Sequence, residues 1–181
     1  MSHQIYYGSI VEDLILLEQV AHGSRAMVEY YQSFLDTSKE CDLSISDFEA
    51  ELIDHEDFLQ ASVSDYLIKC ATRTRIIQDT NKFKTEDPEY CPDKESFERH
   101  SGVAKCLNGK IKLSIRECCN KIIHAKDVNL TFLKLESGIG QYWNGVCALK
   151  GDVQGKPWHI EIDVKKWVLA MKHYYAVIVE L

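Results

Sequence analysis

The first half of the chain holds two long stretches of apolar residues at helical spacing, and this pattern restricts the fold more than any other feature. From about residue 9 to residue 37, apolar residues return every three or four positions, as on the buried stripe of an α-helix. A second stretch runs from about residue 46 to residue 80, with Ser46 as the expected N-cap and Glu49 as its capping-box partner. Two such helices joined by a short polar segment predict an antiparallel pair within a helical bundle.

Two interruptions modify this plan. His22, Gly23 and Ser24 in the first stretch predict a kink or a close helix contact. Residues 81–101 are polar and contain Pro88 and Pro92, so helix is interrupted there, with a turn or short helix expected within 94–100.

The last third of the sequence has a different character. Segments 130–136, 141–150 and 157–163 are short, rich in β-favouring residues and separated by glycines. Trp158, Ile160 and Ile162 alternate with polar residues, which indicates a sheet with one face on the core. Asp163 is then the expected N-cap of a final helix.

These patterns predict a mainly α protein. We expect an antiparallel helical bundle over residues 1–127, followed over 128–181 by a β-hairpin or small antiparallel sheet and a C-terminal helix. The second part should pack on the first to give a single compact unit.

Charge and hydropathy exclude some functional classes. The formal net charge of −7 argues against binding nucleic acid through a broadly basic surface, although one small basic site could still engage RNA. No run of eighteen apolar residues exists and the N-terminus is polar, so we expect a cytoplasmic protein without a membrane partner.

Seven cysteines form neither a CxxC pair nor a regular framework. They are expected to be free thiols in a reducing compartment, mostly buried as small apolar side chains. A zinc site would have to use Cys91, His100 and Cys106, whose spacing does not match a compact ligand knuckle. We therefore expect neither a metal nor another cofactor.

A third amphipathic helix is predicted over about residues 111–126. At 100° per residue, its apolar stripe contains Ile111, Ile115, Cys118 and Ile122, as the period of an α-helix requires. The opposite face gathers three polar side chains within a fan of about 80°. They are Arg116, Asn120 and His124.

This polar face has residue types suited to phosphodiester cleavage without a metal. His124 could take a proton from a ribose 2′-hydroxyl or protonate the leaving oxygen. Arg116 could hold phosphate oxygens, and Asn120 could position a hydroxyl, a water or the histidine tautomer. An exposed polar face without a catalytic role would have the same composition, and a cation near a helix C-terminus is also favourable for structural reasons.

The stretch from Leu113 to Ala125, LSIRECCNKIIHA, resembles the motif helix of the HEPN family (higher eukaryote and prokaryote nucleotide-binding domains). Two long helices before a motif helix also resemble that family's bundle. The resemblance implies a metal-independent endoribonuclease of a bacterial defence or toxin–antitoxin system, with two protomers building the site. It assigns His124 as acid/base, Arg116 as phosphate clamp and Asn120 as positioning group.

The sequence departs from the family motif in one respect. Seven residues separate Arg116 from His124, where four to six are usual in the family. Their Cα atoms should lie about 12 Å apart along the axis, with the Arg116 side chain leaning away from His124. Either a second protomer completes the site, or the chain is an inactive relative.

Three further groups have structural interpretations that we favour. Residues 54–57 (DHED) could suggest a metal site, but adjacent helical residues point in different directions, as on a solvated acidic face. Cys118 lies on the apolar stripe, so burial is expected rather than thiol reactivity. The aromatic residues of the C-terminal part could stack bases but are expected to fill the core. They are Tyr142, Trp143, Trp158, Trp167, Tyr174 and Tyr175.

The sequence thus favours a HEPN-like endoribonuclease that acts on RNA, as a homodimer or with a protein partner. The main alternative is a non-catalytic interaction subunit or regulator built on the same bundle. A bundle that binds a small molecule stays open as a third class.

Overall fold

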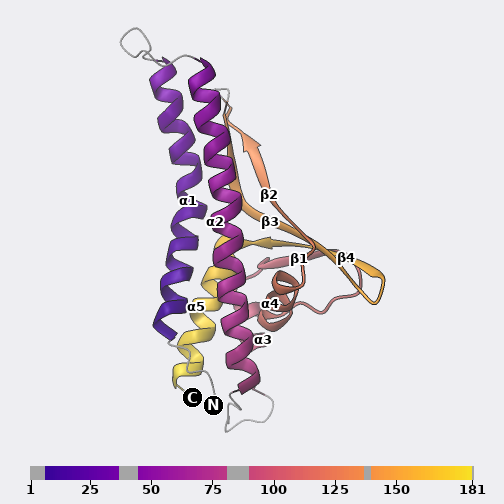
Figure 1. Cartoon of the computed structure of the whole chain (residues 1–181). Helices are drawn as coiled ribbons and strands as arrows, with labels where there is room; N and C mark the ends of the chain where they lie inside the picture. The colour runs from indigo at the N-terminus through magenta and orange to yellow at the C-terminus, as the bar shows by residue number, and fades with distance from the viewer. Residues whose placement is uncertain (1–6, 37–44, 81–89, 137–139, 181) are drawn as a thin grey trace.

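The computed structural model describes residues 7–36, 45–80, 90–136 and 140–180. The fold is mainly helical, with one four-stranded antiparallel sheet lying beside a long helical hairpin (Figure 1). In chain order the elements are α1 (Tyr7–Asp36), α2 (Ile45–Thr80), α3 (Pro92–Arg99), β1 (Ala104–Asn108), α4 (Ile115–Ile123), β2 (Asp127–Lys134), β3 (Gln141–Val153), β4 (Lys156–Asp163) and α5 (Val164–Glu180).

The two long helices predicted from the apolar spacing are confirmed to within two residues at each described end. Helices α1 and α2 lie side by side and run in opposite directions (Figure 1). Leu14 and Leu17 of α1, and Leu59, Val63 and Leu67 of α2, are at most 1% exposed. These side chains form the helical side of the main core, so the apolar stripe of each helix is its buried face.

The structure differs from the prediction at residues 22–24, because the close contact there is with a strand and not with a helix. Helix α1 runs without interruption through Gly23, and Ser24 is 1% exposed. The Ser24 Oγ atom accepts a hydrogen bond of 3.0 Å from the backbone N–H of Trp143 in β3. A small hydroxyl side chain therefore lets the sheet approach the helix at this point.

The sheet has the strand order β1–β4–β3–β2, and all its pairs are antiparallel. Buried residues alternate with half-buried ones along β3 and β4, as predicted for a sheet with one face on the core. The turn between these strands consists of Gln154 and Gly155, both with positive φ, as in the type I′ turn of a two-residue hairpin. Gly151 of β3 lies opposite Trp158 of β4. A Cβ atom at Gly151 would come within 2.5 Å of the indole.

Strand β1 was not predicted. It has only five residues, AKCLN, and none of them is buried, so neither a sustained alternation nor a continuous apolar run marks it in the sequence. It pairs with β4 through Ala104 opposite Ile162 and Cys106 opposite Ile160. The sheet thus takes strands from both sides of residue 127, and the expected division there stays a prediction.

Helix α5 packs against α1 and α3 and begins as predicted, because Asp163 Oδ1 accepts a hydrogen bond from the N–H of Lys166 at 3.2 Å. Trp167 and Met171 are fully buried. The Tyr175 hydroxyl lies 2.5 Å from Thr74 Oγ1 of α2, which ties the helix to the hairpin. Within the part of the chain that the structure describes, no helix is long and apolar enough to span a membrane.

Candidate functional site

Helix α4 is shorter than the sequence predicts. We call Arg116, Asn120 and His124 the motif residues, and the side of the helix that carries them the motif face. The helix covers Ile115–Ile123 rather than about 111–126. Ser114 is the N-cap, and its Oγ accepts a hydrogen bond of 3.2 Å from the Glu117 N–H. This cap fixes the start of the helix, and Ile111 and Leu113 pack on the core from the preceding linker. The apolar period ran on through this linker, which is why the prediction began too early.

The apolar side of α4 lies in the core as predicted. Ile115, Cys118 and Cys119 are fully buried and Ile122 is 6% exposed. The helix packs mainly against α2. This packing leaves the face with the three motif residues turned away from the core.

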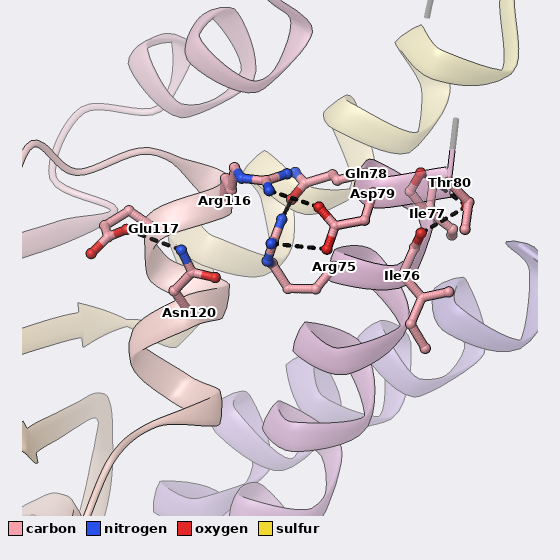
Figure 2. A network of polar contacts seen from close by, with 9 residues as sticks. All are labelled: Arg75, Ile76, Ile77, Gln78, Asp79, Thr80, Arg116, Glu117 and Asn120. Atoms are coloured by element: carbon pink, nitrogen blue, oxygen red, sulfur yellow. Dashed lines mark hydrogen bonds and ion pairs between the residues drawn. The ribbon is translucent and has the colours of Figure 1, made fainter. Parts of the chain in front are cut away.

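Arg116 forms an ion pair with a residue of α2. Its Nη2 atom lies 2.7 Å from Asp79 Oδ1, and the two side chains are 44% and 52% exposed. Asp79 also receives Arg75 Nη2 at 3.0 Å, so one carboxylate lies between two guanidinium groups (Figure 2). The hydrogen bond from Arg116 is the largest reason that the pKa of Asp79 is below its usual value. The Arg116 backbone N–H donates to Asp93 Oδ1 at 2.8 Å, which fixes the start of α4 to α3.

Asn120 turns to a different partner. Its Nδ2 atom donates a hydrogen bond of 3.1 Å to Glu117 Oε2. In Figure 2 the Asn120 amide faces Glu117, whereas the Arg116 guanidinium faces Asp79. The other oxygen of Glu117 lies 3.2 Å from Lys121 Nζ. Glu117 therefore connects Asn120 to Lys121, a residue to which no sequence pattern assigned a role.

His124 is the C-cap residue of α4 and is exposed. Its backbone N–H donates to the Asn120 carbonyl at 3.0 Å. Two residues later, the Lys126 N–H donates to the Lys150 carbonyl of β3 at 2.8 Å. The end of α4 is thus fixed to the sheet, while the imidazole remains open to solvent.

The structure brings the three predicted residues onto one side of α4 but not into one contact network. Arg116 pairs with Asp79, and Asn120 pairs with Glu117. The arrangement offers a guanidinium near the start of the helix and an imidazole at its end, separated by two helical turns. The Glu117–Lys121 pair could have been found from its i,i+4 spacing. Nothing in the sequence points to Asp79 as the partner of Arg116.

The other candidates take structural roles. Trp143, Trp158 and Trp167 are at most 4% exposed and belong to the core, as predicted. The half-buried Glu56 accepts a hydrogen bond from Gln141, while Asp54 and Asp57 are exposed. Among the described residues, no group of three or more His, Cys, Asp or Glu side chains could hold a metal ion. The six described cysteines are free, and Cys41 and Pro88 lie outside the described residues.

No family model matches this chain, and comparison with curated proteins and with solved structures gives no significant match.

Proposed function

We propose that this chain is a HEPN-like cytoplasmic protein of a bacterial defence or toxin–antitoxin system, and that it is a metal-independent endoribonuclease. The observation that carries the proposal is the exposure of both Arg116 and His124 on α4, with Asn120 one turn from each. The two long helices that precede α4 support it too, because they match the order of helices in that family's antiparallel bundle.

The proposed chemistry is transfer of a phosphodiester to the neighbouring ribose 2′-hydroxyl. His124 removes the 2′-hydroxyl proton, the 2′-oxygen attacks phosphorus, and the 5′-oxygen leaves with a proton supplied by an imidazolium. The products are a 2′,3′-cyclic phosphate and a 5′-hydroxyl end. Arg116 would stabilise the charge on the phosphoryl oxygens, and Asn120 would position the ribose or the imidazole.

Dimer formation is part of the proposal. The two helical turns between Arg116 and His124 place them too far apart to hold one phosphate within a protomer. A second copy related by a two-fold axis would bring an arginine from one α4 close to a histidine from the other. A cleavage-competent protein should therefore be a dimer in solution.

A second candidate function rests on a different observation. The Arg116 guanidinium and the Asn120 amide both already contact carboxylates of the same chain, Asp79 and Glu117. In a non-catalytic interaction subunit or regulator, these contacts would simply hold α4 in place. Such a protein would have no use for the exposed imidazole of His124.

Cleavage of a defined single-stranded RNA in the presence of EDTA separates the two candidates. Wild type should cleave the RNA and leave a 2′,3′-cyclic phosphate. His124→Ala should lower the rate by about 10²- to 10⁴-fold, as expected for loss of a general acid/base. His22→Ala, which removes an exposed histidine of α1, is the matched control and should leave the rate unchanged.

Two results would overturn the nuclease proposal. One is intact RNA after incubation with dimeric wild-type protein, and the other is cleavage by His124→Ala at the wild-type rate. Either would leave the non-catalytic subunit as the remaining candidate. Because His124 is exposed, its substitution should not prevent folding.

A further inference from the structure

A cavity of about 780 Å³ lies beside α4, between the linker that precedes this helix and the β3–β4 hairpin. We call it the lysine cavity. It is lined by Lys110 and Lys112 of the linker, Glu117 and Lys121 of α4, and Lys156 with Trp158 of β4, together with neighbouring residues of the linker and the hairpin turn. Its volume is in the range that holds small ligands and cofactors.

The lining of this cavity is basic, although the chain as a whole has a net charge of −7. Four lysines face the cavity, and Glu117 is its single carboxylate. Of these four lysines, only Lys121 forms an ion pair with another described residue. The other three, Lys110, Lys112 and Lys156, are exposed and leave uncompensated positive charge at the cavity mouth. A concave site lined by charge of one sign concentrates its field on the ligand.

Lys121 lies deeper in the cavity wall than the other three. The residue is 8% exposed, and its Nζ atom lies 4.5 Å from the centre of the Trp158 ring and 3.2 Å from Glu117 Oε1. A lysine ammonium has three N–H donors. With one N–H directed at the Glu117 carboxylate and one at the indole face, a third would be left to donate to a ligand. Burying a charge is costly unless it is well compensated, and an anion in the cavity would add to that compensation.

The walls of the lysine cavity are held in place. The side chain of Trp158 covers Gly151, where a Cβ atom would come within 2.5 Å of the ring. Gly109 at the start of the linker has a φ of 99° and also lies against Trp158. A preformed basic site loses less ordering entropy on binding than a flexible one.

We propose that the lysine cavity binds a ligand that carries at least two neighbouring phosphate groups. Lysine ammonium groups are point charges that bind phosphate oxygens from several directions. The three exposed lysines at the mouth and Lys121 in the wall can engage more than one phosphate at once. The buried indole of Trp158 offers no exposed ring on which a base could stack, so recognition is by charge.

This proposal stands apart from the proposed RNA cleavage, although the two sites adjoin. Around the α4 axis, Lys121 lies about 100° from Asn120 and about 60° from His124. Glu117 contacts both Asn120 and Lys121. Neighbouring phosphates could come from a free nucleotide or inorganic polyphosphate, or from consecutive phosphodiesters of an RNA strand that crosses the motif face.

Isothermal titration with inorganic tripolyphosphate, and separately with a short oligouridylate, tests the proposal and distinguishes these sources. Lys112→Gln/Lys156→Gln should weaken binding by roughly tenfold or more, since two charge-assisted contacts are lost. The matched control is Lys94→Gln/Lys134→Gln, which removes the same charge from exposed positions on α3 and β2. The control should bind within about twofold of wild type.

Each outcome has a definite meaning. Tripolyphosphate binding that only the cavity variant loses supports the proposal with a free polyphosphate as ligand, and selective loss of oligouridylate binding alone assigns the site to RNA phosphates. The proposal is overturned if wild type binds neither compound. It is also overturned if the control variant loses as much affinity as the cavity variant. His124→Ala should leave tripolyphosphate binding unchanged, so a failure of the cleavage proposal is seen separately.

The role of Lys121 has its own test. Lys121→Met keeps most of the buried stem and removes the charge, so the variant should fold while binding tripolyphosphate more weakly. Thermal unfolding checks that it folds. A folded Lys121→Met protein with wild-type affinity would remove Lys121 from the site.

Discussion

Asp79 of α2 forms an ion pair with the guanidinium of Arg116, with 2.7 Å between Oδ1 and Nη2. Arg75 contacts the same carboxylate. Asp79 therefore lies at the position that a phosphate group bound by both arginines would take. Exposed ion pairs of this kind contribute only about 0–1 kcal/mol to stability. A ligand phosphate could therefore displace the carboxylate at small cost.

Removing this carboxylate should increase affinity for RNA. In Asp79→Ala, the exposed guanidinium of Arg116 loses its carboxylate partner and can contact a phosphate, so we expect a gain of roughly 1 kcal/mol, about fivefold in Kd. Asp65→Ala is the matched control, because Asp65 is also 52% exposed and pairs with Lys69 on the same helix. Fluorescence anisotropy with labelled RNA measures both variants. Equal affinities would show that only net charge had changed and that Arg116 does not contact RNA.

Ser24→Ala should lower the free energy of unfolding by about 1–3 kcal/mol. The buried Trp143 N–H would lose the Oγ atom that accepts its hydrogen bond, and an unsatisfied buried donor has a cost of this size. Thr72→Ala, which removes a hydroxyl group from an exposed position of α2, is the control and should change stability by less than about 0.5 kcal/mol. Urea unfolding of the two variants checks this difference.

Two glycine-to-alanine substitutions should change the free energy of unfolding in opposite directions. At Gly151 the new methyl group would press into Trp158, so we expect a loss of about 1–3 kcal/mol. At Gly23, within α1, no atom lies within 4 Å of the new methyl group, so Gly23→Ala should gain about 0.5–1 kcal/mol from helix propensity. Melting temperatures should shift in opposite directions, and a stabilising Gly151→Ala would contradict the packing described for the hairpin.

Thiol reactivity should separate the exposed cysteine from the core cysteines. Burial raises the pKa of Cys70 and of Cys147 to about 12, so these thiols stay protonated and covered at neutral pH. Cys91 is exposed. In a Cys41→Ser background, a thiol reagent should modify Cys91 rapidly, whereas Cys70 and Cys147 should react only after denaturant is added. Peptide mapping by mass spectrometry identifies the modified sites, and rapid labelling of Cys147 in folded protein would contradict its placement.

Stability should fall as the pH drops below neutral. Burial lowers the pKa of His55 from its usual 6.5, and burial with nearby His173 lowers that of His100. Between the lowered value and about 6.5, the unfolded chain binds protons that the folded chain does not, so acid favours unfolding. This contribution to stability is complete above pH 6.5 and is lost as the pH falls through that value. Urea unfolding between pH 5 and pH 8 gives the free energy of unfolding as a function of pH. This free energy should depend less steeply on pH in His55→Gln/His100→Gln than in wild type. An unchanged dependence would show that these two histidines do not cause it.

The sequence predicts the helical hairpin well because its signals are long and redundant. The second helix extends over more than thirty residues, and its core positions Leu59, Val63 and Leu67 recur at helical spacing. The β4 strand is predicted for a similar reason, since the buried residues Trp158, Ile160 and Ile162 alternate with more polar, half-buried ones. Strand β1 has only five residues, none of them buried, and it is held by its pairing with β4, so its sequence carries no comparable signal.

The site is less predictable because its contacts join distant segments. Spacing alone places Arg116, Asn120 and His124 on one side of α4, but it says nothing of Asp79, thirty-seven positions earlier in the chain. The lysine cavity combines the linker, α4 and the hairpin turn. Its four lysines are spread over residues 110–156, and only folding brings them together.

The pairing of β1 with β4 has a consequence for how the chain folds during synthesis. Ala104 can pair with Ile162 only after more than fifty further residues have been synthesised. The α1–α2 hairpin is complete much earlier and has its local contacts available as soon as Thr80 leaves the ribosome. We therefore expect a nascent chain in which the hairpin forms first and the sheet closes only after β4 has emerged. Truncation before β4 would leave β1 without its pairing partner, and α1 and α3 without the cover of α5.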